Sequence, residues 1–201
     1  MEYGSRWRTA LFILLGVTLL FLGVWGVTSI ARSLFGPTES SQTTTTQKAL
    51  TEYAKADTSV RLHVGGPIVA NEKYVSYDIE VTQTTRKITT YKTFQNVVTS
   101  VKSYDNNQEA YLNFLTALQI NGYLTKANSA TTTDSTAQCS TGKRYTYYLY
   151  ESAQVKSDLW STSCNGRVGT LGGNGSAIRS LYQAQIPDFN TIVTGDYSTL
   201  R

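Results

Sequence analysis

The sequence predicts an α+β fold: an N-terminal transmembrane helix, then an antiparallel sheet of about five strands with two helices packed on one face. Several short stretches alternate apolar and polar residues, which is the period of a half-buried strand. Two other stretches space their apolar residues as a helix does. Threonine and tyrosine are abundant, with 14 Tyr in 201 residues, and both residue types favour strands.

The N-terminal segment 9–31 contains no charged residue. At about 1.5 Å per residue, a helix of this length crosses the roughly 30 Å core of a bilayer. Arg6 and Arg8 precede the segment and only Arg32 follows it closely. The positive-inside rule therefore predicts a single-pass signal anchor in the cell membrane, with residues 1–8 in the cytoplasm and the remainder outside.

A cleaved signal peptide is the alternative interpretation of this segment. Ser29-Ile30-Ala31 offers a small-x-small cleavage site after Ala31. The apolar run is longer than the roughly 7–15 residues typical of signal peptides, which favours retention as an anchor.

Residues 32–57 are predicted to form a Thr-rich linker, because much of this stretch is too polar and repetitive to bury a core. Residues 58–201 then have the size of one extracytoplasmic domain. Cys139 and Cys164 are the only cysteines. Outside the cytoplasm an even pair is more often a disulfide than a metal half-site or a nucleophile, so we predict a disulfide between them.

Alternation predicts a first strand at 60–64, which runs into the turn Gly65-Gly66-Pro67. It also predicts a hairpin of strands 75–81 and 86–94, joined by a three-residue turn at 83–85. His63 is expected to be an ordinary outward-facing strand residue, because a lone histidine without neighbouring ligands cannot form a zinc site.

A helix is predicted after Asp105-Asn106-Asn107, whose side chains suit the N-cap position. Asn121-Gly122 supplies a stop signal. The predicted apolar face of this helix consists of Leu112, Phe114, Leu115 and Leu118.

The second half predicts a strand at 145–150 and two further strands at 158–164 and 166–171, joined by a hairpin turn at Asn165-Gly166. A helix is then predicted to start with Ser176 as its cap and to end before Pro187. Its predicted inward face consists of Ile178, Leu181 and Tyr182.

The glycine-rich run 169–176 resembles a phosphate-cradling loop at a helix N-terminus, with the N–H groups of Gly175 and Ser176 as candidate donors to an anion. It lacks the lysine of a P-loop. We expect its glycines to serve close approach to the preceding strand, and anion binding is the alternative.

Catalytic chemistry finds little support in the sequence. Asp158 lies beside Trp160 and is the one candidate acid for glycoside hydrolysis, which normally needs two carboxylates. No nucleophile motif and no metal-ligand spacing is present. We therefore predict no catalytic residue, no metal and no cofactor.

The net charge of +4 comes partly from arginines beside the apolar segment, so a nucleic-acid partner is not expected.

The C-terminal quarter carries a resemblance. Its motifs are Gly142-Lys-Arg-Tyr145, Leu159-Trp-Ser-Thr-Ser-Cys164, Gly169-Thr170 and Gln185-Ile-Pro-Asp-Phe189. This part resembles uncharacterised single-pass, membrane-anchored surface proteins of reduced-genome bacteria. The resemblance implies an exported bacterial protein and supplies no activity or binding residue.

Together these features predict an interaction module of the cell surface or envelope, which binds a protein or a glycan. Tyr148, Tyr150 and Trp160 are the candidate contact residues, because large amphipathic side chains favour binding surfaces. A cell-wall glycan hydrolase with Asp158 as its acid is the first alternative. A protease inhibitor with a rigid loop near the disulfide is the second.

Overall fold

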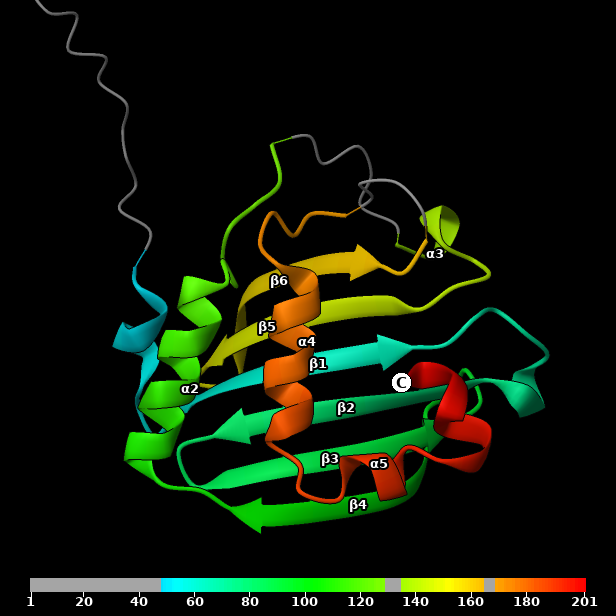
Figure 1. Cartoon of the computed structure of the whole chain (residues 1–201), viewed down its shortest axis with the longest axis horizontal. Helices are drawn as coiled ribbons and strands as arrows, with labels where there is room; N and C mark the ends of the chain where they lie inside the picture. Colours follow the sequence, from blue (N-terminus) through cyan, green and yellow to red (C-terminus); the bar gives the residue numbers. More distant parts are fainter. Residues whose placement is uncertain (1–47, 129–134, 165–168) are drawn as a thin grey trace, which may run out of the picture. The chain divides into compact units, whose positions relative to one another are not determined.

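Six strands form one antiparallel sheet in the order β4-β3-β2-β1-β5-β6 in the computed structural model, which describes residues 48–128, 135–164 and 169–201 (Figure 1). The strands are β1 Thr58–Gly65, β2 Val75–Thr82, β3 Thr85–Lys92, β4 Val97–Asp105, β5 Arg144–Glu151 and β6 Gln154–Thr162. The α-helices are α2 Gln108–Ile120, α3 Ser135–Gln138, α4 Gly175–Ala184 and α5 Phe189–Ile192. The 3-10 helices are η1 Leu50–Tyr53, η2 Asn71–Lys73 and η3 Gly195–Leu200.

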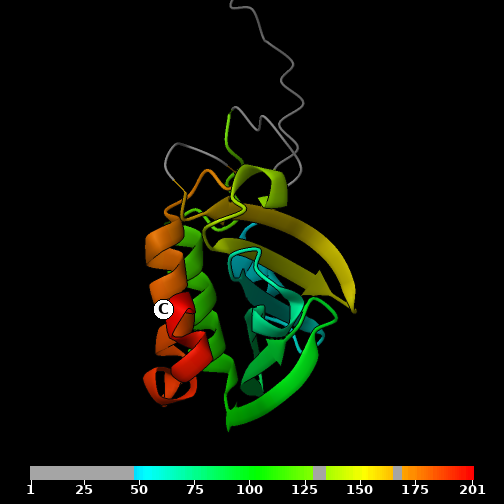
Figure 2. The same ribbon diagram turned by 90° about the vertical axis from the view of Figure 1, so that its right-hand side faces the viewer.

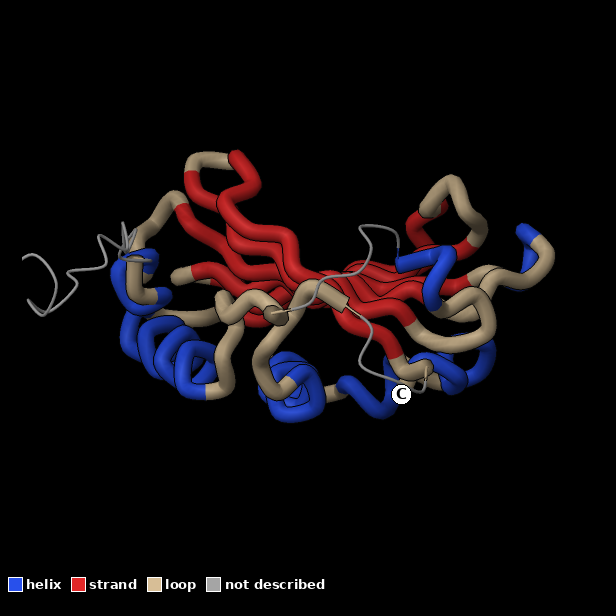
Figure 3. The backbone as a smooth tube through the Cα atoms, turned by 90° about the horizontal axis from the view of Figure 1, so that it is seen from above, coloured by secondary structure: helices blue, strands red, loops and turns tan. Residues whose placement is uncertain are grey.

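The two longer helices, α2 and α4, lie side by side on one face of the sheet, and α5 and η3 lie on the same side (Figure 2). Figure 3 shows no helix over the middle of the opposite face in the described part of the chain, and the strand ends curl toward that side. The predicted α+β class, with an antiparallel sheet and helices on one face, is confirmed. The sheet has six strands rather than about five.

The core lies between the sheet and the helices. Every second residue of β1 is completely buried there, as the alternation predicted, at Val60, Leu62 and Val64. Aromatic side chains fill much of the remaining space, and their rings meet edge to face, as Phe114 does with Tyr182 at a centroid distance of 5.2 Å. The helix-facing side of the sheet is therefore occupied by packing.

The edge strand β4 is absent from the sequence-based prediction, which ended the preceding strand at Phe94. Nearly all of β4 is exposed, including Val97, Val98 and Val101, each more than half exposed. The register also shifts between Thr90 and Tyr91 where β3 pairs with it. A strand with no buried side lacks the inside–outside alternation by which strands are recognised.

The turn between β2 and β3 is shorter than predicted. It consists of Gln83 and Thr84, since β2 ends at Thr82 and β3 begins at Thr85. The Thr82 hydroxyl accepts hydrogen bonds from the backbone N–H groups of Thr84 and Thr85, at 3.2 and 2.9 Å. Side-chain capping of this kind replaces the glycine that a tight hairpin turn usually requires.

The predicted caps and faces of the helices are partly correct. Asn107 caps α2, and its side-chain oxygen accepts from Ala110 N at 2.9 Å. The buried stripe of α2 follows the i, i+3, i+4, i+7 spacing of one helix face, at Tyr111, Phe114, Leu115 and Leu118. Leu112 lies outside this stripe and is 40% exposed.

The second helix begins earlier than predicted. Asn174, not Ser176, caps α4, with its side-chain oxygen 3.1 Å from Ala177 N. Ile178 and Tyr182 face the core as predicted, and Leu181 is half-buried.

The predicted strand 166–171 does not form a strand in its described part. Residues 165–168, with the expected Asn165-Gly166 turn, lie outside the described residues. Beyond them, Gly169 and Leu171 make isolated bridges to Ser161 and Lys126. β6 itself begins at Gln154, earlier than the predicted 158.

The predicted disulfide is present between Cys139 and Cys164, whose Cα atoms lie 5.7 Å apart. It joins the segment before β5 to the segment after β6. It thereby ties together the chain segments that flank this hairpin.

The compact unit spans Lys48–Arg201 and so includes part of the predicted linker. Leu50 in η1 is buried in the core, and the Thr51 N–H donates to the side chain of Gln119 in α2. The predicted cytoplasmic residues 1–8 and membrane segment 9–31 lie outside the described residues. Within the described ranges, no helix is both long and apolar enough to cross a membrane.

Candidate functional site

The face of the sheet opposite the helices carries a cluster of polar and aromatic side chains, and we call this face the open face. The strand register determines which side chains are neighbours on the open face. On β1, His63 lies opposite Asp78 of β2, and Arg61 lies opposite Tyr148 of β5. Side chains directly opposite each other in an antiparallel pair are close enough to interact, and β1 therefore joins residues of both of its neighbours.

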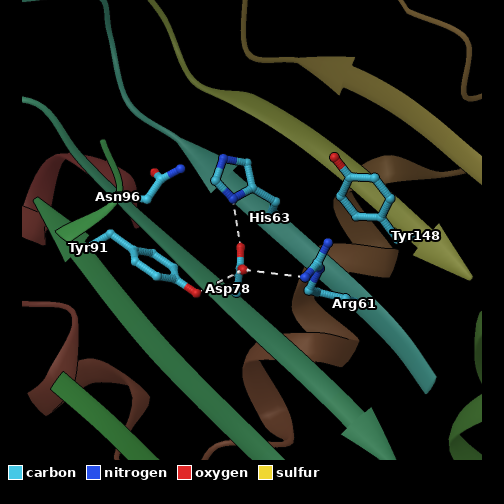
Figure 4. A pocket seen from close by; sticks show the side chains of 6 residues that line it. All are labelled: Arg61, His63, Asp78, Tyr91, Asn96 and Tyr148. Atoms are coloured by element: carbon cyan, nitrogen blue, oxygen red, sulfur yellow. Dashed lines mark hydrogen bonds and ion pairs between the residues drawn. The ribbon is translucent and has the colours of Figure 1, made fainter. Parts of the chain in front are cut away.

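These side chains line a cavity of about 330 Å³, which we call the Asp78 pocket (Figure 4). Its lining residues come from four adjacent strands and from the turn after β3. They are Arg61, His63, Asp78, Tyr91, Asn96 and Tyr148.

The Asp78 carboxylate is the centre of the hydrogen-bond network in this pocket. His63 Nδ1 lies 2.6 Å from Oδ1, and the Tyr91 hydroxyl donates to Oδ2 at 3.2 Å. Arg61 Nη1 lies 4.0 Å from Oδ2. Because an ionised carboxylate can only accept hydrogen bonds, His63 must donate through Nδ1, and Nε2 is then an acceptor whenever the ring is neutral.

Arg61 is held between Asp78 and two tyrosine rings. Its guanidinium carbon lies 4.7 Å from the ring centroid of Tyr148 and 4.8 Å from that of Tyr150. Arg61 Nη2 also donates to the Tyr150 hydroxyl. Cation–π contacts and an ion pair together restrict this long side chain to one position.

Two phenols of the network have raised pKa values. Burial raises the pKa of Tyr91, and the negative charge of Asp78 raises it further. Burial also raises the pKa of Tyr150, which the positive charge of Arg61 lowers in part. Both phenols therefore stay protonated at neutral pH, so that Tyr91 can keep donating to Asp78.

Asn96 reaches the pocket from a strained turn. Thr93 and Asn96 both have positive φ angles, of 63° and 55°. A positive φ is unfavourable for a β-branched residue such as threonine. Local contacts hold the turn, because Thr93 N donates to Tyr74 O at 2.9 Å and the Phe94 ring stacks on Tyr74 at a centroid distance of 4.2 Å.

Two of the predicted contact residues belong to this site. Tyr148 lines the Asp78 pocket, and Tyr150 lies beside it with a ring distance of 5.7 Å. Trp160 is only 7% exposed, so most of its indole cannot touch a partner. It lines a second cavity of about 400 Å³, in which Asp158 is the single acid among the described lining residues.

Gly175 and Ser176 do not line the Asp78 pocket. They begin α4, on the helix side of the sheet. The Gly175 N–H already donates to Gly173 O at 3.1 Å, so one of the two predicted anion donors is in use.

Glycines of the run 169–176 approach other backbone segments closely, as expected. They contact the preceding strand and also the end of α2. A Cβ on Gly169 would lie 2.4 Å from Trp160 O in the preceding strand. A Cβ on Gly173 would lie 2.3 Å from Gly122 O, just after α2.

His63 faces outward as predicted, but it is not an isolated strand residue. The sequence-based prediction missed Arg61, Asp78, Tyr91 and Asn96 as members of its site. The available signal was the set of polar residues that alternate with the core positions of 60–64 and 75–81. Within the described ranges, no group of three or more His, Cys, Asp or Glu side chains is placed to hold a metal ion.

Comparison with known proteins provides no assignment. The chain matches no protein-family model and none of the curated proteins. Its function has to be argued from the chemistry of the site itself.

Proposed function

We propose that residues 48–201 form a binding module that the N-terminal apolar segment displays outside the cytoplasm, and that its ligand is a component of the cell surface or envelope. The observation that carries this proposal is the Asp78 pocket. It is a concave, polar site in the middle of a sheet face, and its residues are not needed to fill the core. Pockets with a few convergent polar groups are the default location of ligand binding.

The rigidity of the site supports the proposal. Arg61, His63, Asp78 and Tyr148 project from central strands, and mutual contacts hold the first three in place. A site whose side chains are already ordered loses little conformational entropy when a ligand binds.

The location outside the cytoplasm has two separate supports. The disulfide between Cys139 and Cys164 is typical of an oxidising compartment. The resemblance of the C-terminal quarter to exported surface proteins agrees with the charge pattern around segment 9–31.

Location is tested by labelling intact cells with a membrane-impermeant amine reagent. Residues 1–47 contain no lysine, so every labelled lysine of this sequence reports on residues 48–201. We expect exposed lysines such as Lys102 to be labelled and the N-terminal amine to be protected. Labelling of the N-terminus alone in intact cells contradicts the proposed orientation.

Binding is tested with the purified full chain in detergent, by measuring how much envelope material it retains. Arg61→Met removes the guanidinium but keeps an apolar stem. We expect it to reduce retention about tenfold, the effect of removing a residue that dominates an interface. Lys102→Met on the edge strand β4 is the matched control, because it removes one positive charge elsewhere. Equal retention by both variants rejects the Asp78 pocket as the binding site.

A further inference from the structure

The lining of the Asp78 pocket is balanced in charge. Apart from His63, whose ring is charged only when it is protonated, Arg61 supplies one positive charge and Asp78 one negative charge, 4.0 Å apart. The guanidinium also donates to Tyr150 and is covered by the rings of Tyr148 and Tyr150. A charged ligand would compete with this ion pair for one of its two members, and breaking an existing pair costs free energy. The pocket therefore favours a ligand without net charge.

Three polar groups of the pocket keep unused hydrogen-bonding capacity. They are His63 Nε2, the Tyr148 hydroxyl and the Asn96 carboxamide, and none of these groups has a hydrogen-bond partner among the described residues. Nε2 of the neutral ring accepts, whereas the hydroxyl and the carboxamide both donate and accept. Ligand hydroxyls also donate and accept, so a ligand with several hydroxyl groups satisfies all three.

Aromatic rings stand beside these polar groups. Figure 4 shows Tyr91 and Tyr148 on opposite sides of Asp78 and Arg61. The face of a tyrosine ring carries partial negative charge. The C–H groups on the flat side of a sugar ring carry partial positive charge and can lie against it, while the hydroxyls around the sugar's edge reach His63 and Asn96.

We infer that the Asp78 pocket binds an uncharged sugar unit of a glycan, an inference that rests on the proposed binding function. The cavity of about 330 Å³ lies at the small end of the roughly 300–1,000 Å³ range of ligand sites. It holds a small part of a chain, and the remaining sugar units extend across the open face of the sheet.

The test titrates the full chain in detergent with neutral tetrasaccharides of N-acetylglucosamine, mannose, glucose and galactose, and follows binding by calorimetry. Tetragalacturonate is the charged counterpart of the galactose probe, because its rings carry carboxylates and the same ring hydroxyl arrangement. We expect saturable binding of at least one neutral probe and none of tetragalacturonate. Binding of tetragalacturonate alone overturns the inference, because it would identify an anion site.

Two variants place the sugar in the pocket. Tyr148→Phe removes one hydroxyl, and Asn96→Gly removes the carboxamide while suiting the positive φ of this position. Each should weaken binding about two- to tenfold, the effect of one lost hydrogen bond. Neither group has a hydrogen-bond partner in the described structure, so both variants should fold. Tyr104→Phe is the matched control. It also removes one tyrosine hydroxyl, but this hydroxyl donates to Asp188 and does not line the Asp78 pocket. Unchanged affinity in both pocket variants overturns the assignment.

Failure of the sugar inference differs from failure of the proposed function. If no neutral probe binds while the full chain still retains envelope material through Arg61, the ligand is not an uncharged sugar and the binding module stands. If the full chain retains no envelope material and binds no probe, both proposals are wrong.

Discussion

At the scale of single residues, burial separates the three aromatic side chains that the sequence nominated as contacts. Tyr148 and Tyr150 are half-buried on the open face, and their rings also hold Arg61. Trp160 is buried on the edge strand β6, where it lies opposite Thr146 of β5, and its Nε1 has no hydrogen-bond partner among the described residues. A tryptophan in this position contributes mainly to packing.

Trp160→Ala is therefore expected to destabilise the domain, by about 3–5 kcal/mol, because it removes a large buried side chain and leaves a cavity. Tyr148→Ala should cost less, about 1 kcal/mol, since its ring is partly solvated already. Urea unfolding of the two variants measures both values. Equal destabilisation would show that Tyr148 is a core residue and would remove it from the binding site.

At the scale of elements, close backbone contacts connect the two longer helices. The residues just before α4 pass over the end of α2, where Gly173 faces the carbonyl groups of Asn121 and Gly122. Asn174 N also donates to Asn121 O at 2.9 Å. Close backbone packing thus accounts for Gly169 against β6 and for Gly173 against the end of α2.

Gly173→Ala should lower the free energy of unfolding by about 1–3 kcal/mol, because a Cβ there would lie 2.3 Å from a backbone oxygen and force the segment to move. Gly195→Ala is the control. Its Cβ would meet nothing within 4 Å, and only the positive φ of 54° opposes the change. Thermal unfolding that ranks the control variant as the less stable of the two would contradict this packing.

At the scale of the whole molecule, the core depends on protonated tyrosines. Burial is the largest cause that raises the pKa of the five tyrosines that are completely buried in the described part of the chain: Tyr77, Tyr111, Tyr123, Tyr147 and Tyr182. Their hydroxyls lie between the sheet and the helices, where ionisation would place a negative charge in apolar surroundings.

The stability of the domain should consequently fall at alkaline pH. In the unfolded chain these tyrosines lose their protons near the ordinary pKa of 10.0, whereas in the folded chain they keep them to higher pH. Above that pH the folded state binds more protons than the unfolded state, so stability decreases as pH rises. Well below the ordinary tyrosine pKa, these side chains are protonated in both states and add no pH dependence to the free energy of unfolding. Urea unfolding across this range measures the slope, and constant stability above the tyrosine pKa would contradict the buried, protonated core.

The sequence by itself determined the features that depend on neighbouring residues. Alternation located β1, β2 and β5, the Asn107 side chain marked the start of α2, and the cysteine pair predicted the disulfide. Each of these follows from local periodicity, capping chemistry or the number of cysteines. The exposed strand β4 has no such pattern and was missed.

Only the tertiary structure decided which residues line the Asp78 pocket and that Trp160 is buried. Arg61 and Tyr148 are far apart in the chain and meet because β1 lies between β2 and β5 in the sheet. The register between β1 and β2 places His63 opposite Asp78, and the register between β1 and β5 places Arg61 opposite Tyr148. Strand order and register arise from the way the whole core packs, and a shift of one residue would move every one of these side chains to the other face.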